Sequence, residues 1–485
     1  MKRLAWLLSV AVATGTLCAA GGRAAPAATP LQIGAVVPEL LDRGHVGSTV
    51  EAMTDSGLDD AGRVALTWKR GQKVLDPSLL SDLQYGIQQA AASGIDIYLT
   101  LYPAGPNDAP LTVAARTTFA RWAAWLVARL PELRHVVIGN EPNLNRFWLP
   151  QFDRHGRDVA APAYVRLLAR TYDTIKAVAP SVEVVGGALA HMGLNRPSSL
   201  RDTQAPQRFL LDMGKAYRGS GRKRPIMDAF AFHPYLEHAD LPPTYKHYSP
   251  RVITIADYGR LVSLLRRAFD GTAQAGSKIP IVYAEFGVES RIPAALLAAY
   301  TGTEPPTTRP VNESVQGRYY AKAMQMAACQ PTVRTFLVFR LIDEHLRGGW
   351  QSGLYYANGS PKASLPAVEA AARRLQEQTP TGCATLLAPR PRVSFFPARK
   401  PTARFPTLKP VSLLPDADCI YEVRLGKGSS LVARVRGRAV AGVRKHIGLT
   451  EAFLSRGTYR ITIRVTATDF RAKPFTKSIR FTFQG

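Results

Sequence analysis

Short, almost uninterrupted runs of apolar residues recur along the first three quarters of the chain, and a longer stretch separates each run from the next. The eight runs cover residues 33–37, 64–68, 95–101, 136–138, 182–185, 229–232, 281–284 and 336–339. Continuous apolar runs of this length are typical of parallel strands that are covered on both faces. The pattern therefore predicts eight parallel strands.

The stretches between these runs carry apolar residues at helical spacing. The clearest are 119–130, 164–179 and 258–269, and a proline or an Asp-Gly pair follows each of them directly. Alternating strands and helices predict a parallel α/β fold, and a count of eight favours a closed (β/α)8 TIM barrel over an open sheet. The absence of a glycine-rich dinucleotide-binding loop after the first run also argues against the open sheet.

The pattern changes near residue 380, where a series of prolines between 389 and 410 indicates a domain boundary. Beyond it, apolar and polar residues alternate along 459–466 and 479–483, and Leu431 and Val435 alternate with Arg434 and Arg436. Such alternation predicts antiparallel strands with one exposed face, so we expect a small all-β sandwich of immunoglobulin or fibronectin type. The predicted division is 29–382 for the barrel and 383–485 for the sandwich.

The first 28 residues differ from the rest of the chain. Lys2 and Arg3 precede an apolar run over 4–17, and small residues follow as far as Ala28. This order is typical of a secretory signal peptide, and the apolar run is short for a membrane span. We therefore expect a protein that is secreted or associated with the cell envelope after the leader is removed.

Removal of the leader would take Cys18 with it and leave three cysteines. In an oxidising compartment we expect Cys329 and Cys383 to form a disulfide and Cys419 to remain a buried free thiol. The three are scattered, with no CxxC spacing, so a zinc site is not expected.

The formal net charge of +26 is concentrated near the C-terminus, where residues 390–485 hold 20 Lys and Arg against 5 Asp and Glu. A solvated basic face of the predicted sandwich accounts for this charge in the simplest interpretation. The alternative is attraction of the C-terminal domain to an anionic cell-surface polymer, such as an acidic cell-wall glycan. Export and the absence of a recognisable binding motif argue against nucleic acid.

Two glutamates stand directly after predicted strands. Glu141 lies in His135-Val-Val-Ile-Gly-Asn-Glu-Pro-Asn143, just past the fourth run, and Glu285 lies in Pro280-Ile-Val-Tyr-Ala-Glu-Phe-Gly287, directly after the seventh. The carboxyl ends of barrel strands share one face, which is where active sites of such barrels lie. The two carboxylates can therefore face each other across the mouth of the barrel.

Over roughly residues 31–375 these motifs resemble glycoside hydrolase clan A, the 4/7 superfamily that includes families 5 and 39. The resemblance implies a retaining β-glycoside hydrolase in which Glu141 is the acid/base and Glu285 the nucleophile. A retaining mechanism needs two carboxyl groups about 5–5.5 Å apart, one protonated and one ionised at the outset. The resemblance also implies a carbohydrate substrate, and the mechanism needs neither a metal nor an organic cofactor. Separately, residues 457–469 resemble the penultimate strand of bacterial immunoglobulin-like modules.

Further site residues follow from the same comparison and from their places at strand ends. Asn140 would hydrogen-bond the sugar 2-hydroxyl, and His233 and Tyr235 resemble the clan's His-x-Tyr motif, with Tyr235 donating to Glu285. Trp350 would provide a flat ring on which a pyranose stacks. Arg70 and Tyr102, after the second and third strands, complete the expected substrate contacts.

Two other classes of function remain open at this point. One is a catalytically inactive carbohydrate-binding protein on the same scaffold, against which the intact pair of glutamates argues. The other is a cell-envelope attachment protein that acts mainly through its basic C-terminal domain. The sequence leaves the sugar, its linkage and the choice between endo and exo cleavage undetermined.

Overall fold

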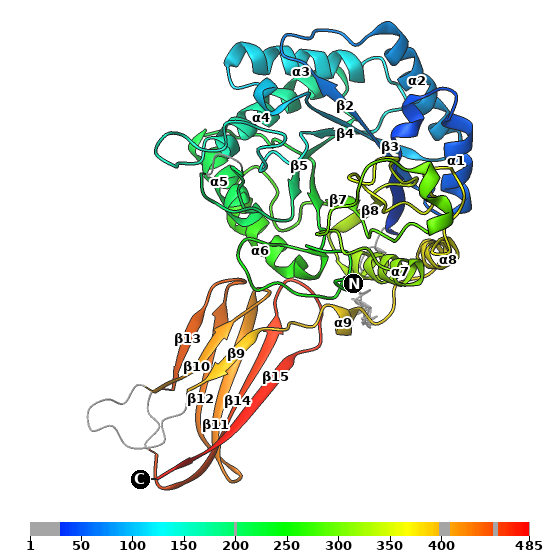
Figure 1. The fold of residues 1–485 in the computed structure, drawn as a ribbon. Coiled ribbons are helices and arrows are strands. Elements are labelled where there is room, and N and C mark those ends of the chain that lie inside the picture. Colours follow the sequence, from blue (N-terminus) through cyan, green and yellow to red (C-terminus); the bar gives the residue numbers. More distant parts are fainter. Residues whose placement is uncertain (1–29, 198–200, 397–407, 450–453, 485) are drawn as a thin grey trace, which may run out of the picture.

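A computed structural model of the chain describes residues 30–197, 201–396, 408–449 and 454–484. The expected signal peptide lies outside these residues. The described part comprises a closed barrel and two antiparallel sheets (Figure 1). Within it, every helix is too short or too polar to cross a membrane.

The barrel consists of eight parallel strands that pair in chain order, with β8 returning to pair with β1. The TIM barrel prediction is therefore confirmed. The strands are β1 (Gln32–Val36), β2 (Ala61–Trp68), β3 (Asp96–Pro103), β4 (His135–Ile138), β5 (Glu183–Ala190), β6 (Ala229–His233), β7 (Ile281–Phe286) and β8 (Val333–Val338).

Helices surround the barrel (Figure 1). They are α1 (Val46–Asp55), α2 (Pro77–Ala92), α3 (Val113–Val127), α4 (Ala160–Val178), α5 (Pro206–Gly219), α6 (Tyr258–Phe269), α7 (Glu313–Cys329) and α8 (Leu365–Glu377). Short 3-10 helices lie in the connecting segments: η1 (Pro38–Leu41), η2 (Pro106–Asp108), η3 (Ile255–Asp257) and η4 (Ala294–Ala299). Local sequence sets several helix starts; the Asp76 carboxylate, for example, accepts from the amides of Ser78 (2.9 Å) and Leu79 (3.2 Å), with Pro77 in the first turn of α2.

Beyond the barrel, two antiparallel sheets pack into a sandwich, as predicted. One sheet has the order β13 (Lys445–Leu449), β10 (Leu408–Leu414), β9 (Arg392–Phe395), and the other β12 (Ser430–Ala439), β11 (Cys419–Lys427), β14 (Gly457–Ala467), β15 (Phe475–Phe483). Residues from both sheets, including Val411, Val423 and Ile463, form one buried core. The immunoglobulin type of this sandwich stays a prediction.

The expected inward position of Leu431 is wrong, because its side chain is 59% exposed. The β11–β12 ladder contains an irregularity in which Leu425 pairs with Ala433 while the next residue, Gly426, pairs with Leu431. The extra residue on β12 reverses the alternation at this end of the strand.

The sandwich is joined to the barrel through α6, which lies between the two parts (Figure 1). Arg266 of α6 forms ion pairs with Asp418 and Asp469 of the sandwich. Gly259 packs so closely that a Cβ there would lie 2.6 Å from the Cβ of Ala417. This joint is therefore made of close packing as well as charge.

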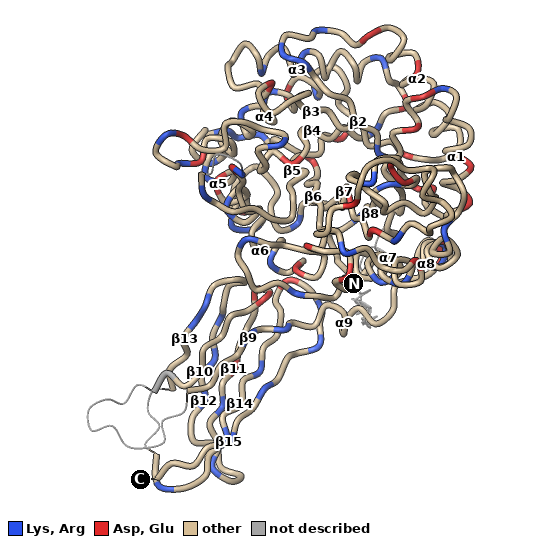
Figure 2. The backbone as a smooth tube through the Cα atoms, viewed as in Figure 1, with Lys and Arg blue, Asp and Glu red and all other residues tan. Residues whose placement is uncertain are grey.

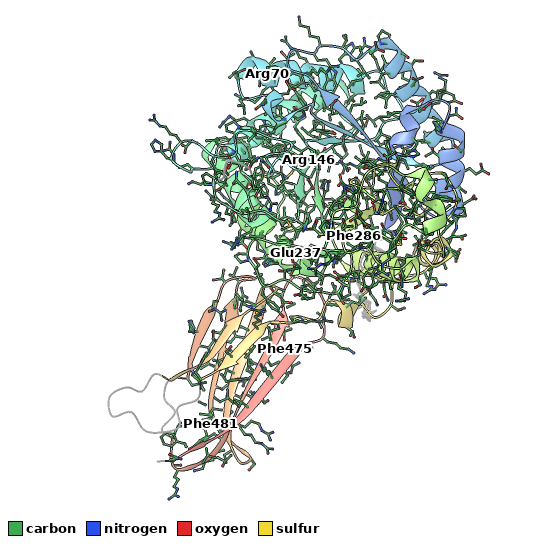
Figure 3. The ribbon with its side chains drawn as sticks, in the orientation of Figure 1. Arg70, Arg146, Glu237, Phe286, Phe475 and Phe481 are labelled. Atoms are coloured by element: carbon green, nitrogen blue, oxygen red, sulfur yellow. A yellow bond between two sulfur atoms is a disulfide. The ribbon has the colours of Figure 1, made fainter. Side chains whose placement is uncertain are left out.

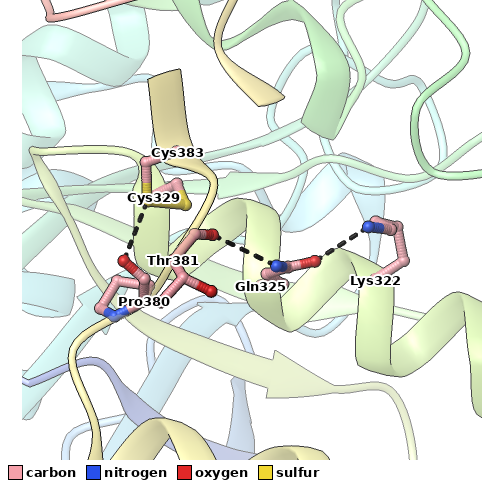
Figure 4. The surroundings of a disulfide bond; sticks show 6 residues. All are labelled: Lys322, Gln325, Cys329, Pro380, Thr381 and Cys383. Atoms are coloured by element: carbon pink, nitrogen blue, oxygen red, sulfur yellow. Dashed lines mark hydrogen bonds between the residues drawn. A yellow bond between two sulfur atoms is a disulfide. The ribbon is translucent and has the colours of Figure 1, made fainter. Parts of the chain in front are cut away.

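A disulfide joins the end of α7 to the short helix α9 (Cys383–Leu386), at the beginning of the predicted second domain (Figure 4). Its partners are Cys329 and Cys383, the expected pair, and Cys419 is a buried free cysteine, also as expected. Next to it, the Gln325 side chain donates to the Thr381 carbonyl at 3.3 Å. The bond ties the segment after α8 to the wall of the barrel.

Candidate active site

Glu141 lies directly beyond β4, in a segment with an unusual backbone. Gly139 has a φ of 95° and Glu141 itself has a φ of 41°, and the Glu141 amide donates to the Ala188 carbonyl at 2.8 Å. A left-handed conformation is costly for a residue other than glycine, and it persists at functional sites when the surroundings fix it. The side chain is 16% exposed, so its carboxylate is accessible from the mouth of the barrel.

Glu285 is the fifth residue of β7, and both of its carboxylate oxygens have donors. The Arg63 guanidinium donates to Oε1, and the Tyr235 hydroxyl donates to Oε2 at 2.9 Å. Nδ1 of His233 lies 3.4 Å from the same Oε2. The side chain is only 11% exposed, so these three residues, rather than solvent, stabilise its charge.

His233 stands between the two glutamates. Its Nδ1 lies 3.0 Å from Oε1 of Glu141, and the ligand atoms of Glu141, His233 and Glu285 all lie within 4.8 Å of one another. Nδ1 faces an oxygen of each carboxylate, so it can donate toward them in the tautomer that carries its proton on this nitrogen. The structure therefore brings the two glutamates to one point at the carboxyl end of the barrel strands.

The surroundings of Glu285 favour its ionised form. Burial alone would raise the pKa of this carboxyl group, but the charges of His233 and Arg63 and the hydrogen bonds from Arg63 and Tyr235 outweigh it, and the pKa is lowered. Burial and the neighbouring Glu285 charge raise the pKa of Tyr235 well above its ordinary value, so the phenol stays protonated and remains a donor.

Arg63 is the site residue that the sequence analysis missed. It lies in β2, is 3% exposed, and donates to the Thr100 hydroxyl (2.7 Å) and to Oδ1 of Asn140 (2.9 Å) as well as to Glu285. One guanidinium therefore positions both Glu285 and Asn140. Because Arg63 holds the amide oxygen of Asn140, the NH2 group of that residue is left for another partner.

Arg70, which was expected to line the site, does not contact either glutamate. It is exposed, lies beyond the end of β2 and donates to the Asn107 carbonyl. Figure 3 shows it far from Phe286, the neighbour of Glu285. The cation beside the carboxylate comes instead from an inward position within β2, because only such a position reaches the centre of the barrel.

The two expected aromatic residues lie beside this centre. The Trp350 ring is half-buried, with its centroid 5.0 Å from that of Tyr235 and 5.2 Å from that of Phe339. Tyr102, the penultimate residue of β3, is also half-buried; burial raises its pKa, which the charges of Arg63 and Glu285 also influence. Both rings therefore lie near the two carboxylates.

Glu141, His233 and Glu285 are near enough to one another to be considered as metal ligands. However, both oxygens of Glu285 already accept hydrogen bonds, and one of the donors is the Arg63 guanidinium, whose charge would repel a cation. The donor set is therefore better suited to nucleophilic attack and proton transfer than to holding a metal.

No protein-family model and no curated protein matches the sequence. Among solved structures, a β-glucuronidase from Bacteroides uniformis is 12% identical, with 94% of this chain and 46% of that chain covered and a TM-score of 0.45. An exo-β-1,4-mannosidase from an Opitutaceae bacterium is 16% identical, with 75% and 63% covered and a TM-score of 0.46. A β-glucosidase from Thermotoga maritima is 12% identical, with 69% and 86% covered and a TM-score of 0.44.

This chain thus spans less than half the length of the β-glucuronidase. These likenesses are too distant to transfer a function, so the function is inferred from the side chains of this chain's own site.

Proposed function

We propose that this protein is a retaining β-glycoside hydrolase with Glu285 as nucleophile and Glu141 as acid/base. The observation that carries the proposal is that ligand atoms of Glu141, His233 and Glu285 lie within 4.8 Å of one another, and that of the two glutamates it is Glu285 to which Arg63 donates. A retaining mechanism uses carboxyl groups about 5–5.5 Å apart, whereas an inverting one needs about 6.5–9.5 Å to admit a water molecule. The short separation therefore favours retention.

In the first step, the ionised Glu285 attacks the anomeric carbon while the glycosidic C–O bond breaks. Glu141 gives its proton to the departing oxygen, and a covalent glycosyl ester on Glu285 results. In the second step, Glu141 removes a proton from water, whose oxygen attacks the same carbon. The ester bond breaks and Glu285 is again a carboxylate.

The neighbouring side chains act on defined atoms in this scheme. Arg63 and Tyr235 hold the two oxygens of Glu285 and keep the nucleophile ionised before attack. Asn140, whose oxygen is held by Arg63, presents its NH2 group to the sugar 2-hydroxyl. His233 donates toward Glu141 and Glu285 and so fixes their relative positions.

Export of the protein is part of the proposal. The charged, apolar and small-residue order of residues 1–28 supports it, as does the disulfide between Cys329 and Cys383, because such bonds persist in oxidising compartments. Detection of the mature chain outside the cytoplasm, shortened by its leader, would test this point.

The catalytic roles are tested with Glu285→Ala and Glu141→Ala on a panel of 4-nitrophenyl β-glycosides, with the exposed Glu132→Ala as control. Glu285→Ala should lose essentially all turnover. Glu141→Ala should keep measurable activity, because nitrophenolate leaves without a proton, and azide should restore part of the rate.

The azide products separate the two roles. In Glu141→Ala, azide replaces water on the glycosyl-enzyme and should give the β-glycosyl azide, whereas in Glu285→Ala it replaces the nucleophile and should give the α-anomer. Equal loss in both variants without rescue would contradict the assignment. Sugar binding without turnover by the intact protein would favour the inactive carbohydrate-binding alternative.

A further inference from the structure

The outer face of the four-stranded sheet of the sandwich carries seven exposed arginines. The pairing of the strands sets them side by side: Arg424 lies opposite Arg434, and Arg460 lies opposite Arg480. Figure 2 shows the basic residues along this sheet. We call the set the arginine face; it consists of Arg424, Arg434, Arg436, Arg438, Arg460, Arg464 and Arg480.

One carboxylate lies on this face among the described residues of its four strands. It belongs to Glu422, which accepts from Arg424, Arg434 and Arg436. Hydrogen bonds from Arg434 and Arg436 lower the pKa of Glu422 to about 2. The face therefore already holds one carboxylate between three guanidinium groups.

The other arginines of the face are not bonded to a carboxylate of the described residues, although Arg464 lies opposite Glu422 on the neighbouring strand. Within the part of the chain that the structure describes, Arg438, Arg460, Arg464 and Arg480 form no ion pair. Like charges directly opposite each other destabilise a sheet, as at the Arg460–Arg480 pair. The Arg460–Arg480 pair therefore disfavours folding of the sandwich, and this points to an external anion that would bind there.

The positions of the arginines suit a linear ligand. Arg434 and Arg424 face each other on β12 and β11, and Arg460 and Arg480 face each other on β14 and β15. Arg460 lies opposite Gly426, two residues along β11 from Arg424, so the two pairs form a stepped row across the four strands. With strands about 4.8 Å apart and a two-residue step of about 7 Å along them, this stepped row is about 16 Å long. Hydroxyl side chains lie among and beside the arginines, where they can bond to sugar hydroxyls: Thr458, Thr462, Thr466, Thr476, Ser478 and Thr482.

We propose that the arginine face binds a linear polysaccharide that carries carboxylates. The guanidinium fork pairs with a carboxylate through two parallel hydrogen bonds, as a row of Arg side chains can do repeatedly along a chain. The bound carboxylate of Glu422 and the interspersed hydroxyls favour this ligand over a polyphosphate. The inference goes beyond hydrolysis and does not require the barrel glutamates to be catalytic.

The test uses the mature full-length protein and measures binding to fluorescently labelled polygalacturonate by anisotropy, with dextran as the uncharged comparison. The face variant replaces the row with glutamine: Arg424→Gln, Arg434→Gln, Arg460→Gln and Arg480→Gln. The matched control removes the same charge from exposed positions just after α3 and on α4 and α5: Arg129→Gln, Arg166→Gln, Arg170→Gln and Lys215→Gln. A smaller variant with only Arg460→Gln and Arg480→Gln guards against misfolding.

We expect the face variant to bind polygalacturonate at least about tenfold more weakly, and the double variant to show an intermediate loss. The control variant should bind polygalacturonate like the wild type, and added salt should weaken binding by the wild type and by the control. Hydrolysis of small aryl glycosides should be the same in all variants, so failure of the catalytic proposal would be recognised separately. An equal loss in the control would overturn the inference, as would tighter binding of a DNA duplex or of a polyphosphate than of polygalacturonate.

Discussion

Replacement of Arg63 with methionine isolates the charge that keeps Glu285 ionised. Methionine has a similar length and fills the buried space without a charge, so the barrel core is disturbed little. Glu285 then keeps the Tyr235 and His233 contacts but loses the guanidinium on Oε1. Asn140 loses the donor to its Oδ1 at the same time.

The size of the effect follows from burial. Arg63 is 3% exposed and Glu285 11% exposed. Keeping the Glu285 carboxylate ionised without its buried partner costs about 3–5 kcal/mol of free energy. Because Tyr235 and His233 still face Glu285, we expect a cost toward the lower end of this range. At about 1.4 kcal/mol per factor of ten, kcat/KM for an aryl glycoside should decrease roughly 10²–10³-fold.

The pH profile provides the second measurement. Arg63 lowers the pKa of Glu285, and the attacking form is the ionised one, so removal of Arg63 should move the acidic limb of kcat/KM to higher pH. Arg63→Lys should give a smaller shift, because it keeps the charge, while Arg129→Met on the outer surface should change neither measurement. Circular dichroism verifies that Arg63→Met is folded. An unchanged rate and an unmoved acidic limb in a folded variant would refute the reasoning.

Three further outcomes are expected. Tyr235→Phe removes one hydrogen bond to an ionised carboxylate, which is worth about 1.5–3 kcal/mol. The glycosylation rate measured by stopped flow should therefore decrease roughly 10- to 100-fold. A wild-type rate would exclude this contact from catalysis. Cys329→Ser with Cys383→Ser opens a loop with a sequence separation of 54 residues, which lowers the free energy of unfolding by about 4 kcal/mol. The midpoint of thermal unfolding should therefore decrease. Reductant should lower the midpoint of the wild type but not that of the variant. Burial lowers the pKa of His191 from 6.5 to about 3, so the folded chain binds this proton less well than the unfolded chain. Urea titrations should therefore show a free energy of unfolding that decreases as the pH is lowered from 6.5 toward 3, with a shallower slope in His191→Gln.

The strands of the barrel could be predicted because burial on both faces leaves a direct trace in the sequence. The same trace explains why Arg63 was missed: its charge interrupts the apolar run, so the predicted strand began at residue 64, whereas β2 begins at Ala61. A charged residue inside a buried strand needs a partner, and that requirement would have pointed to a carboxylate within the barrel.

Other parts of the structure depend on contacts that no local pattern records. The exposure of Leu431 follows from an extra residue in one strand of a pair, which alternation in a single strand does not show. The place of Trp350 beside Tyr235 depends on the path of the chain after β8, and the meeting of Glu141 with Glu285 depends on closure of the barrel. Sequence placed these residues at one end of the barrel, and tertiary structure set their separations.

The joint at α6 links the stability of the sandwich to the geometry of the site. The segment that leaves β6 carries Tyr235, pairs with the sandwich through Lys246 and Asp416, and then enters α6, where Gly259 lies against Ala417. Loosening of the sandwich is thereby transmitted along one continuous piece of chain to the phenol that touches Glu285. Mild heating or truncation at the C-terminus should therefore reduce the proposed hydrolysis while most of the barrel is still intact.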